Sequence, residues 1–317
     1  ADDLALFAGS ATDLQSMVSE AESAARAIGF LFRPDKCCVV ARKGGKPITD
    51  VVVKLHHVDI PVLPHDKSVM YLGAPQGLGL PRAEIVQACD SLSRDINLLK
   101  SCLLAPWQKL DALRTFLLPR LDYLCRARTV RHAALLPTEK QLMLFIRDIC
   151  GLPRFSSRHF PFAPRSHGGL GLVRLSLNAA IMRMTQACRM LSSPDPVVVM
   201  VARHRINRAA IRAGMQAGSH TACTGFLSPI TEASGQSRNG PVSLWADARK
   251  SLRSLCAGVT FAVDHTITVT ARDAHGADHT FIPRVMVSKL RQLARLNEGA
   301  ALAAQGAQGR VSRRMAT

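Results

Sequence analysis

The sequence lacks the features that would define a membrane-spanning, secreted or zinc-dependent protein. Charged residues interrupt every apolar stretch before it reaches the ~18 residues of a membrane-spanning helix, and no signal-peptide pattern is recognisable. The nine cysteines form no C-x-x-C pair, and none lies near a histidine at the spacing of a zinc finger. We therefore expect isolated thiols that pack as small hydrophobes, in an intracellular protein with no membrane association.

Acidic residues are also scarce. The 317 residues include 23 Asp and Glu against 41 Lys and Arg, which gives a net charge of +18. A surplus of this size favours polyanionic partners, because each neutralised phosphate releases counterions. Hydrophobic residues still make up 47% of the chain, so most of it can fold around a core, and its length suggests about two domains. This composition favours a protein that binds nucleic acid over a protein that is basic but has no such partner.

The N-terminal part predicts half of a sheet domain. Residues 4–8 form an apolar segment that we interpret as a strand. Ser10 and Asp13 then form a capping-box pattern, and apolar residues at helical spacing continue to Gly29, a favourable helix stop. Short strands follow between residues 30 and 72. This order predicts one sheet with the helix packed on one of its faces.

Helical spacing dominates the rest of the chain. Apolar residues within 85–99, 110–124 and 142–149 predict three helices with short connections, the second bent by Pro119, as in a small bundle. Further helices and one alternating strand pair follow. The predicted fold class is α+β, with four parts: a partial sheet in 1–80, a helical bundle in 81–153, a basic helical linker in 154–241, and a helix, a β-hairpin and a basic C-terminal helix in 242–317.

Two further sequence patterns, a histidine pair and a glycine-rich segment, do not predict a metal site or a dinucleotide site. His56 and His57 have no carboxylate at ligand spacing, so we interpret them as part of a loop. Gly168, Gly169 and Gly171 do not follow a strand of a β-α-β unit, so they do not predict a dinucleotide site.

Adjacent acids at the start of the chain are the strongest chemical signal. Asp2 and Asp3 stand directly before the apolar residues 4–8, and neighbouring carboxylates stay ionised at low cost when a cation binds them. Mg²⁺ is the oxygen-preferring choice, and two such ions can serve nucleotidyl transfer. A solvated turn explains an isolated acidic pair equally well, so the surrounding segments decide its meaning.

Those segments resemble the reverse transcriptases of non-LTR retrotransposons. Ala1-Asp2-Asp3 matches the catalytic turn of the polymerase palm. After the helix, "GFLFRPDKC" matches a second palm segment of this family, with Arg33 in place of the usual Asn. "YLG" matches the start of the primer-grip hairpin. "WQKLDALRTFLLPRLDYLCR", "IRDICGLPR" and "HGGLGL" resemble the thumb and the following region, most closely those of the class that inserts into ribosomal RNA genes. The similarity is specific to about residue 175 and faint beyond it.

This resemblance implies a function and a set of site residues. The chain would be a fragment holding the C-terminal part of the palm, the thumb and a linker, inactive alone because the fingers and a third catalytic Asp lie upstream. The intact enzyme would perform target-primed reverse transcription in the nucleus with an RNA template, a DNA primer, dNTP and target DNA. The residues implied are Asp2 and Asp3 as Mg²⁺ ligands, Lys36 near the nucleotide, Tyr71, Leu72 and Gly73 as the primer grip, and Arg114, Arg120, Arg126, Arg128 and Arg131 as phosphate contacts.

Two other classes of function remain open from the sequence. The chain could be a non-catalytic nucleic-acid-binding remnant of a decayed element, which shares the basic surface without the chemistry. It could also be a scaffold for a protein partner, which predicts no affinity for nucleic acid and contacts that salt does not weaken.

Overall fold

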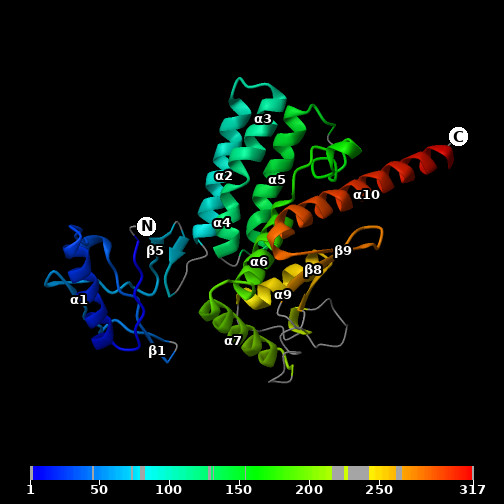
Figure 1. Ribbon diagram of the computed structural model, residues 1–317. Helices are drawn as coiled ribbons and strands as arrows, with labels where there is room; N and C mark the ends of the chain where they lie inside the picture. The colour runs from blue at the N-terminus through cyan, green and yellow to red at the C-terminus, as the bar shows by residue number, and fades with distance from the viewer. Residues whose placement is uncertain are drawn as a thin grey trace. The chain divides into compact units, whose positions relative to one another are not determined.

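The computed structural model describes residues 3–44, 46–72, 74–78, 83–127, 130, 132–153, 155–215, 225–227, 243–261 and 266–315. Helices and small antiparallel sheets are both present, as an α+β protein requires (Figure 1). The chain divides into two compact units, Ala1–Glu84 and Ile85–Thr317. Each unit has a hydrophobic core of its own.

The helix predicted at the start of the first unit is confirmed. Helix α1 spans Ala11–Ala27, and the Ser10 side chain accepts a hydrogen bond from the Asp13 backbone N–H at 3.1 Å, which satisfies one of the free donors of the first turn. Gly29 follows the helix with φ of 80°, the left-handed conformation that glycine adopts at helix ends without steric cost.

The single sheet predicted for this unit is wrong. Residues 3–8 form no strand, and the later segments form three separate two-stranded antiparallel ladders: β1 (Arg42–Lys43) with β2 (Lys46–Pro47), β3 (Lys54–Leu55) with β4 (Val58–Asp59), and β5 (Val69–Tyr71) with β6 (Ala74–Gln76). Prolines explain the short ladders, because proline cannot donate to a neighbouring strand. Pro47 and Pro75 lie within ladders, and Pro61 and Pro64 flank the isolated bridge that joins Val39 to Val62.

A small core nevertheless joins the helix to these ladders. Val53 and Leu55 are buried with Val39 and Ile60, and Leu14 and Val18 of α1 pack against this cluster. A polar contact fixes the same packing, since Gln15 on α1 both accepts from the backbone N–H of Lys54 at 2.7 Å and donates to its carbonyl at 3.0 Å. The helix therefore packs on β3, as predicted, although no extended sheet surrounds it.

The second unit begins with a bundle of the three predicted helices. Helix α2 spans Ala83–Ser101. The next segment comprises α3 (Pro106–Ala112), a π-helical turn (Leu113–Leu117, η2) and α4 (Arg120–Ala127), and α5 spans His132–Ile149. The π turn lies just before Pro119, and there the Leu118 N–H donates to the carbonyl of Leu113, five residues back. A proline that removes a donor commonly forces such a local rearrangement.

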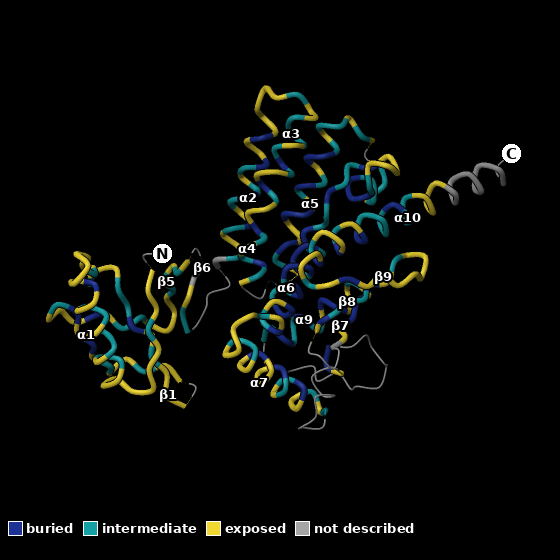
Figure 2. Tube along the Cα trace, in the orientation of Figure 1, coloured by how far each residue is buried: buried dark blue, intermediate teal, exposed yellow. Residues whose placement is uncertain are grey.

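The remaining elements surround α6. Helices α6 (Leu175–Leu191), α7 (Pro196–Arg212) and α9 (Leu244–Ser254) are followed by β7 (Ala257–Phe261), β8 (Ile267–Arg272), β9 (Asp278–Phe281) and α10 (Met286–Met315). The strands form one antiparallel sheet in the order β7-β8-β9, so the predicted hairpin is confirmed and β7 extends it. Ile181 and Met182 on α6 are fully buried, and Figure 2 draws this helix mainly in the colours of buried and intermediate residues.

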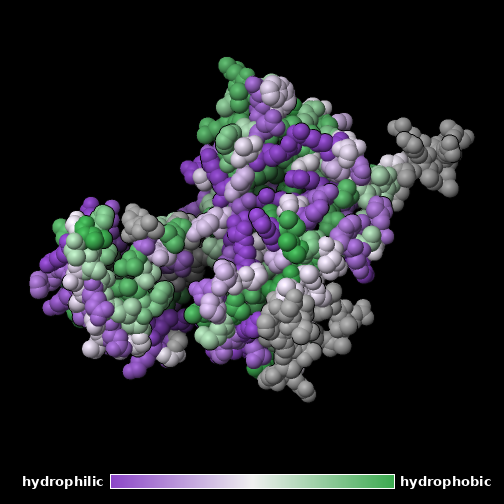
Figure 3. Space-filling view, in the orientation of Figure 1, coloured by the Kyte–Doolittle hydropathy of each residue, from purple (hydrophilic) through white to green (hydrophobic). Residues whose placement is uncertain are grey.

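The cysteines agree only in part with the expectation that they pack as small hydrophobes, since Cys89, Cys125 and Cys188 are buried but Cys102 and Cys256 are exposed. All eight cysteines in the described ranges are free. Burial raises the pKa of Cys125 and of Cys188 to about 12, so both behave as neutral hydrophobic side chains. No helix of the described chain is long and apolar enough to cross a bilayer. Exposed apolar side chains do occur, for example Leu103 and Leu104 at the hydrophobic tip between α2 and α3 (Figure 3).

Candidate nucleic-acid interface

The candidate catalytic residues of the first unit are exposed. Asp2 lies outside the described residues, and Asp3 is exposed in the segment without regular structure. Lys36 ends a short 3₁₀ turn, η1 (Pro34–Lys36), and is exposed as well. Next to it, Arg33 and Asp35 form an ion pair at 2.6 Å, which raises the pKa of Arg33 and lowers that of Asp35. The structure thus leaves Asp3 and Lys36 accessible to a ligand, and their catalytic roles stay predictions.

The predicted primer-grip residues lie at a hairpin. Tyr71 ends β5 opposite Ala74, and Leu72 occupies the turn between the strands with φ of 49°. Gly73 lies outside the described residues. Left-handed backbone is unfavourable for leucine, so the tight turn holds Leu72 in a strained conformation with its side chain 54% exposed. A rigid turn that presents an apolar side chain is compatible with the predicted contact to a primer strand.

The loop assigned to His56 and His57 is confirmed as a tight turn between β3 and β4. Both residues have positive φ, 51° and 64°. The imidazole of His56 lies 2.7 Å from the Glu22 carboxylate through Nδ1 and 3.1 Å from the Phe32 carbonyl through Nε2. Partial burial acts to raise the pKa of Glu22, but the hydrogen bonds from the His56 side chain and backbone outweigh it and lower that pKa. These contacts stabilise the turn.

The metal site expected at the acidic pair is not formed by the described residues alone. Across these ranges, no group of three or more His, Cys, Asp and Glu side chains could hold a metal ion. The carboxylate oxygens of Asp2 and Asp3 suit Mg²⁺ chemically, since this cation prefers oxygen ligands. Two adjacent carboxylates do not complete a coordination shell, so a bound Mg²⁺ would need further oxygen ligands.

Three of the five predicted phosphate-binding arginines are described, and all three have contacts within the protein. Arg120 forms an ion pair with Asp95 on α2. The Nε of Arg126 lies 3.2 Å from the sulfur of Met182. Arg114 donates to the carbonyl of Leu170 at 2.6 Å. Arg128 and Arg131 lie outside the described residues. The predicted basic row is therefore partly used to join helices.

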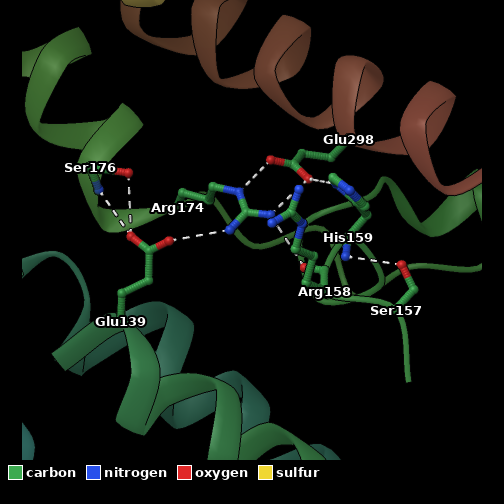
Figure 4. A network of polar contacts seen from close by, with 7 residues as sticks. All are labelled: Glu139, Ser157, Arg158, His159, Arg174, Ser176 and Glu298. Atoms are coloured by element: carbon green, nitrogen blue, oxygen red, sulfur yellow. Dashed lines mark hydrogen bonds and ion pairs between the residues drawn. The ribbon is translucent and has the colours of Figure 1, made fainter. Parts of the chain in front are cut away.

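A polar network that sequence analysis missed connects three segments of the second unit (Figure 4). Arg174, just before α6, donates through Nε and Nη2 to Glu298 on α10 and through Nη1 to Glu139 on α5 at 3.2 Å. Its guanidinium also lies 4.3 Å from the ring centroid of Phe162. Burial acts to lower the pKa of Arg174, but its hydrogen bonds to both carboxylates outweigh this effect and raise that pKa. His159 completes the network with Nδ1 2.6 Å from Glu298.

A second network joins α4, α6 and α10. Arg291 donates to Asp122 at 2.7 Å and to the side-chain oxygen of Asn178 at 2.8 Å, and Asn178 donates in turn to Asp122 at 2.6 Å. These contacts bring α10 to the bundle that the sequence analysis treated as a separate domain. The polar groups of both networks bond to one another within the protein. The networks therefore stabilise the fold and do not form a ligand-binding site.

Unpaired positive charge is concentrated on α7. Ala202, Ile206 and Ala210 form the buried side of this helix. Its arginines are all exposed and have no ion-pair or hydrogen-bond partner in the described part of the chain: Arg203, Arg205, Arg208 and Arg212. No acidic residue occurs within the helix, and its outer surface mixes hydrophilic side chains with the exposed Val197, Met200 and Val201 (Figure 3).

The α7 arginines can therefore contact phosphates without losing a partner in the described part of the chain. Arginine suits this role because its planar guanidinium donates two parallel hydrogen bonds to phosphate oxygens. The sequence contained a usable signal, namely four arginines and no acid within one amphipathic helix. The helix predicted between Asp195 and Met215 is confirmed, and the phosphate contacts expected on the bundle stay predictions.

Comparison with known proteins shows that the chain is similar to retrotransposon proteins. No family model matches it. It is 28% identical over 190 residues to the Retrovirus-related Pol polyprotein from type-2 retrotransposable element R2DM of Drosophila melanogaster, covering 58% of this chain and 18% of the polyprotein. It is 23% identical over 207 residues to the corresponding polyprotein from type-1 retrotransposable element R2 of Popillia japonica, covering 63% of this chain and 42% of that protein.

An uncharacterized protein of Caenorhabditis elegans is 25% identical over 167 residues, covering 52% of this chain and 48% of that protein. The chain thus spans less than half of the length of each of these relatives. The two polyproteins show that it is related to the Pol proteins of non-LTR retrotransposons, as the resemblance in the sequence implied.

Proposed function

We propose that the chain forms part of a retrotransposon reverse transcriptase and that its second unit binds the nucleic acid on which the enzyme acts. The observation that carries this proposal is the α7 surface, where four exposed arginines have no partner among the described residues. The relationship to two retrotransposon Pol polyproteins supplies the enzyme class. An RNA template paired with a DNA primer is the nucleic acid that this class would present.

The proposal extends to the chemistry of the longer protein. Asp2 and Asp3 would be two of the carboxylate ligands of Mg²⁺, and the dNTP would lie near Lys36. Tyr71, Leu72 and Gly73 would contact the primer strand. The exposure of Asp3, Lys36 and Leu72 is compatible with these roles, since a buried side chain could not reach a nucleotide or a primer.

Binding of an RNA–DNA hybrid at several salt concentrations tests the proposal. We expect the logarithm of affinity to fall linearly with the logarithm of salt concentration, with a slope of ~0.9 per neutralised phosphate. Replacing all four α7 arginines with Gln should reduce the magnitude of that slope by up to ~3.5 units. Base preference should change little, because phosphate contacts carry no sequence information. Fluorescence anisotropy of a labelled hybrid and of single-stranded RNA measures both quantities.

A charge-preserving variant is the matched control. With Lys at the same four positions the net charge is unchanged, so the slope should stay close to that of the wild type. A second control replaces the exposed Arg94 and Lys140 on α2 and α5 with Gln, which removes two charges away from α7. Salt-independent affinity, or equal effects of the α7 and control variants, would refute the proposed role of α7.

The catalytic part needs a separate experiment. In a protein that contains the chain together with the rest of a polymerase domain, Asp3→Asn should abolish Mg²⁺-dependent primer extension and leave the salt dependence of binding unchanged. Loss of both properties would assign Asp3 to folding or binding instead of catalysis.

A further inference from the structure

Two arginines from separate segments of the second unit share one carboxylate. Arg114 lies in the π turn η2, and Arg165 begins the 3₁₀ turn η3 (Arg165–His167). Nη1 of Arg114 lies 4.0 Å from Oδ1 of Asp111 on α3, and Nη2 of Arg165 lies 3.8 Å from the same oxygen. Neither distance allows a hydrogen bond. One exposed carboxylate therefore balances two guanidiniums only weakly.

Arg114 is held in place but retains an unused donor. Its Nη2 donates to the carbonyl of Leu170 at 2.6 Å, which fixes the orientation of the guanidinium plane. Its Nε is buried and has no hydrogen-bond partner. A buried donor without a partner costs free energy, so the charge of Arg114 is poorly compensated within the protein. The side chain as a whole is 32% exposed, which leaves it accessible to a ligand from solvent.

Helix α10 brings a third arginine to the same place. Gly299 of α10 lies against the turn that carries Arg165, so closely that a Cβ at position 299 would come within 2.9 Å of the Pro164 ring. Arg295 precedes Gly299 by one helical turn and so lies on the same side of α10. Its Nε is also buried without a partner. Burial lowers the pKa of Arg295, and the positive charges of Arg114 and Arg291 lower it further.

The charges in this cluster repel one another. Burial lowers the pKa of Arg114, the positive charge of Arg165 lowers it further, and Asp111 only partly opposes these effects. Two guanidiniums thus lie near a single carboxylate, and Arg295 adds a third positive charge close to Arg114. A phosphate would relieve this repulsion and accept from the guanidinium of Arg165, whose side chain is 68% exposed and whose geometry matches the oxygens of a phosphate.

We propose that Arg114, Arg165 and Arg295 bind one backbone phosphate of a nucleic-acid strand, and that Asp111 competes with that phosphate. This inference rests on the proposed function, since it assigns a phosphate contact of the nucleic acid to these three arginines in addition to those on α7. The site takes residues from α3, the π turn, η3 and α10, so only the folded unit assembles it.

Opposite charge changes at the site provide the test. Arg165→Gln should weaken binding of the labelled RNA–DNA hybrid about tenfold, as expected for loss of a hydrogen bond to a charged group, and should reduce the magnitude of the salt slope by ~0.9. Asp111→Asn should strengthen binding, because it removes the competing carboxylate. Both side chains are more than half exposed, so neither change should unfold the protein.

Three further measurements decide the outcome. Arg94→Gln is the matched control, and its effect on affinity should be smaller than that of Arg165→Gln. Weaker or unchanged binding by Asp111→Asn, together with unchanged binding by Arg165→Gln, overturns the inference. Pyrophosphate binding that Arg165→Gln abolishes, with hybrid binding unchanged, also overturns it, because the site would then take a free phosphate. If the α7 Gln variant loses binding and Arg165→Gln does not, this inference fails and the proposed function stands.

Discussion

Arg174 shows how one residue can join three helices. Its guanidinium contacts Glu298 on α10 and Glu139 on α5, and it immediately precedes α6. Only 20% of the Arg174 side chain is exposed, and the two glutamates are more buried still. Removing the arginine would leave two poorly solvated carboxylates, which among the described residues would keep Ser176 alone for Glu139 and His159 alone for Glu298. Removing one partner of a buried ion pair destabilises a protein by much more than the intact pair stabilises it, because a buried charge is left uncompensated.

We therefore predict that Arg174→Ala lowers the free energy of unfolding of the second unit by about 3 kcal/mol. Arg174→Lys should be intermediate, because lysine keeps the charge and cannot donate to both glutamates from one plane. Urea unfolding followed by circular dichroism measures the change. The matched control is Arg272→Ala, which breaks an exposed, solvent-screened ion pair with Asp278 and should change the stability much less. Equal losses in Arg174→Ala and Arg272→Ala would contradict the assigned role.

Asp273 provides a second prediction for a single residue. It lies in the turn between β8 and β9, where it pairs with His279 at 2.9 Å and accepts from the backbone N–H groups of Ala277 and His275. The hydrogen bond from His279, followed by that from Ala277, lowers the pKa of Asp273 from 3.8 to about 2. A lowered pKa in the folded state stabilises the protein above the unfolded-state pKa, and this contribution is lost as pH falls towards the folded-state value.

Asp273→Asn should therefore be less stable than the wild type at pH 7, and the difference should shrink between pH 4 and pH 2. Urea midpoints at pH 7, 3 and 2 measure this convergence, and a carbon-13 titration of the carboxyl group measures its pKa directly. A titration midpoint near 3.8, or a difference in stability that persists at pH 2, would show that the turn does not depend on the charge.

At the scale of elements, a loop of the second unit depends on one close backbone contact. Gly169 follows η3, and its N–H donates to the carbonyl of Pro164 at 3.0 Å. A Cβ at this position would lie 2.6 Å from the carbonyl carbon of Ala163 and closer still to its oxygen. Backbone atoms cannot move away as a flexible side chain can. The "HGGLGL" motif thus has a steric reason for glycine in this loop.

Gly169→Ala should consequently lower the stability of the second unit by about 1–3 kcal/mol or more, as overpacking does. Gly306→Ala is the matched control, because Gly306 is exposed in α10 and a Cβ there would meet no atom within 4 Å. That change should stabilise α10 by up to ~1 kcal/mol, since alanine favours helix. Thermal unfolding of both variants tests the pair, and opposite signs are expected. A neutral Gly169→Ala would mean that the loop shifts freely.

At the scale of the whole molecule, the two units have separate cores. Val39, Val53, Leu55 and Ile60 form the core of the first unit, and none of them belongs to the larger cluster of the second. The first core is small, so the loss of one large side chain removes much of it. The units should respond separately to core substitutions.

We predict that Leu55→Ala destabilises the first unit by about 2 kcal/mol or more without lowering amide protection in residues 85–317. Ile181→Ala, in the fully buried helix α6, should have the reverse effect. Hydrogen exchange followed by mass spectrometry resolves the two units in one experiment. Loss of protection throughout the chain in either variant would show that the units fold as one.

The sequence by itself determined the local elements, the charge and the relationship to known proteins. The Ser10 cap, the stop at Gly29, the bend at Pro119 and the strand pair of β8 and β9 depend on neighbouring residues, and all four were predicted correctly. The sheet predicted for the first unit was wrong, because ladder formation depends on distant partners and prolines remove several donors.

Only the tertiary structure decided which charges are internal and which face solvent. Arg291 pairs with Asp122 across 169 positions of the chain, and Arg174 reaches Glu298 across 124. Local periodicity places an arginine on one side of a helix, but it does not say which carboxylate packs opposite. For this reason Arg114, Arg120 and Arg126 each have a contact within the protein that local sequence did not predict, while the arginines of α7 form no ion pair with an acid of the described residues.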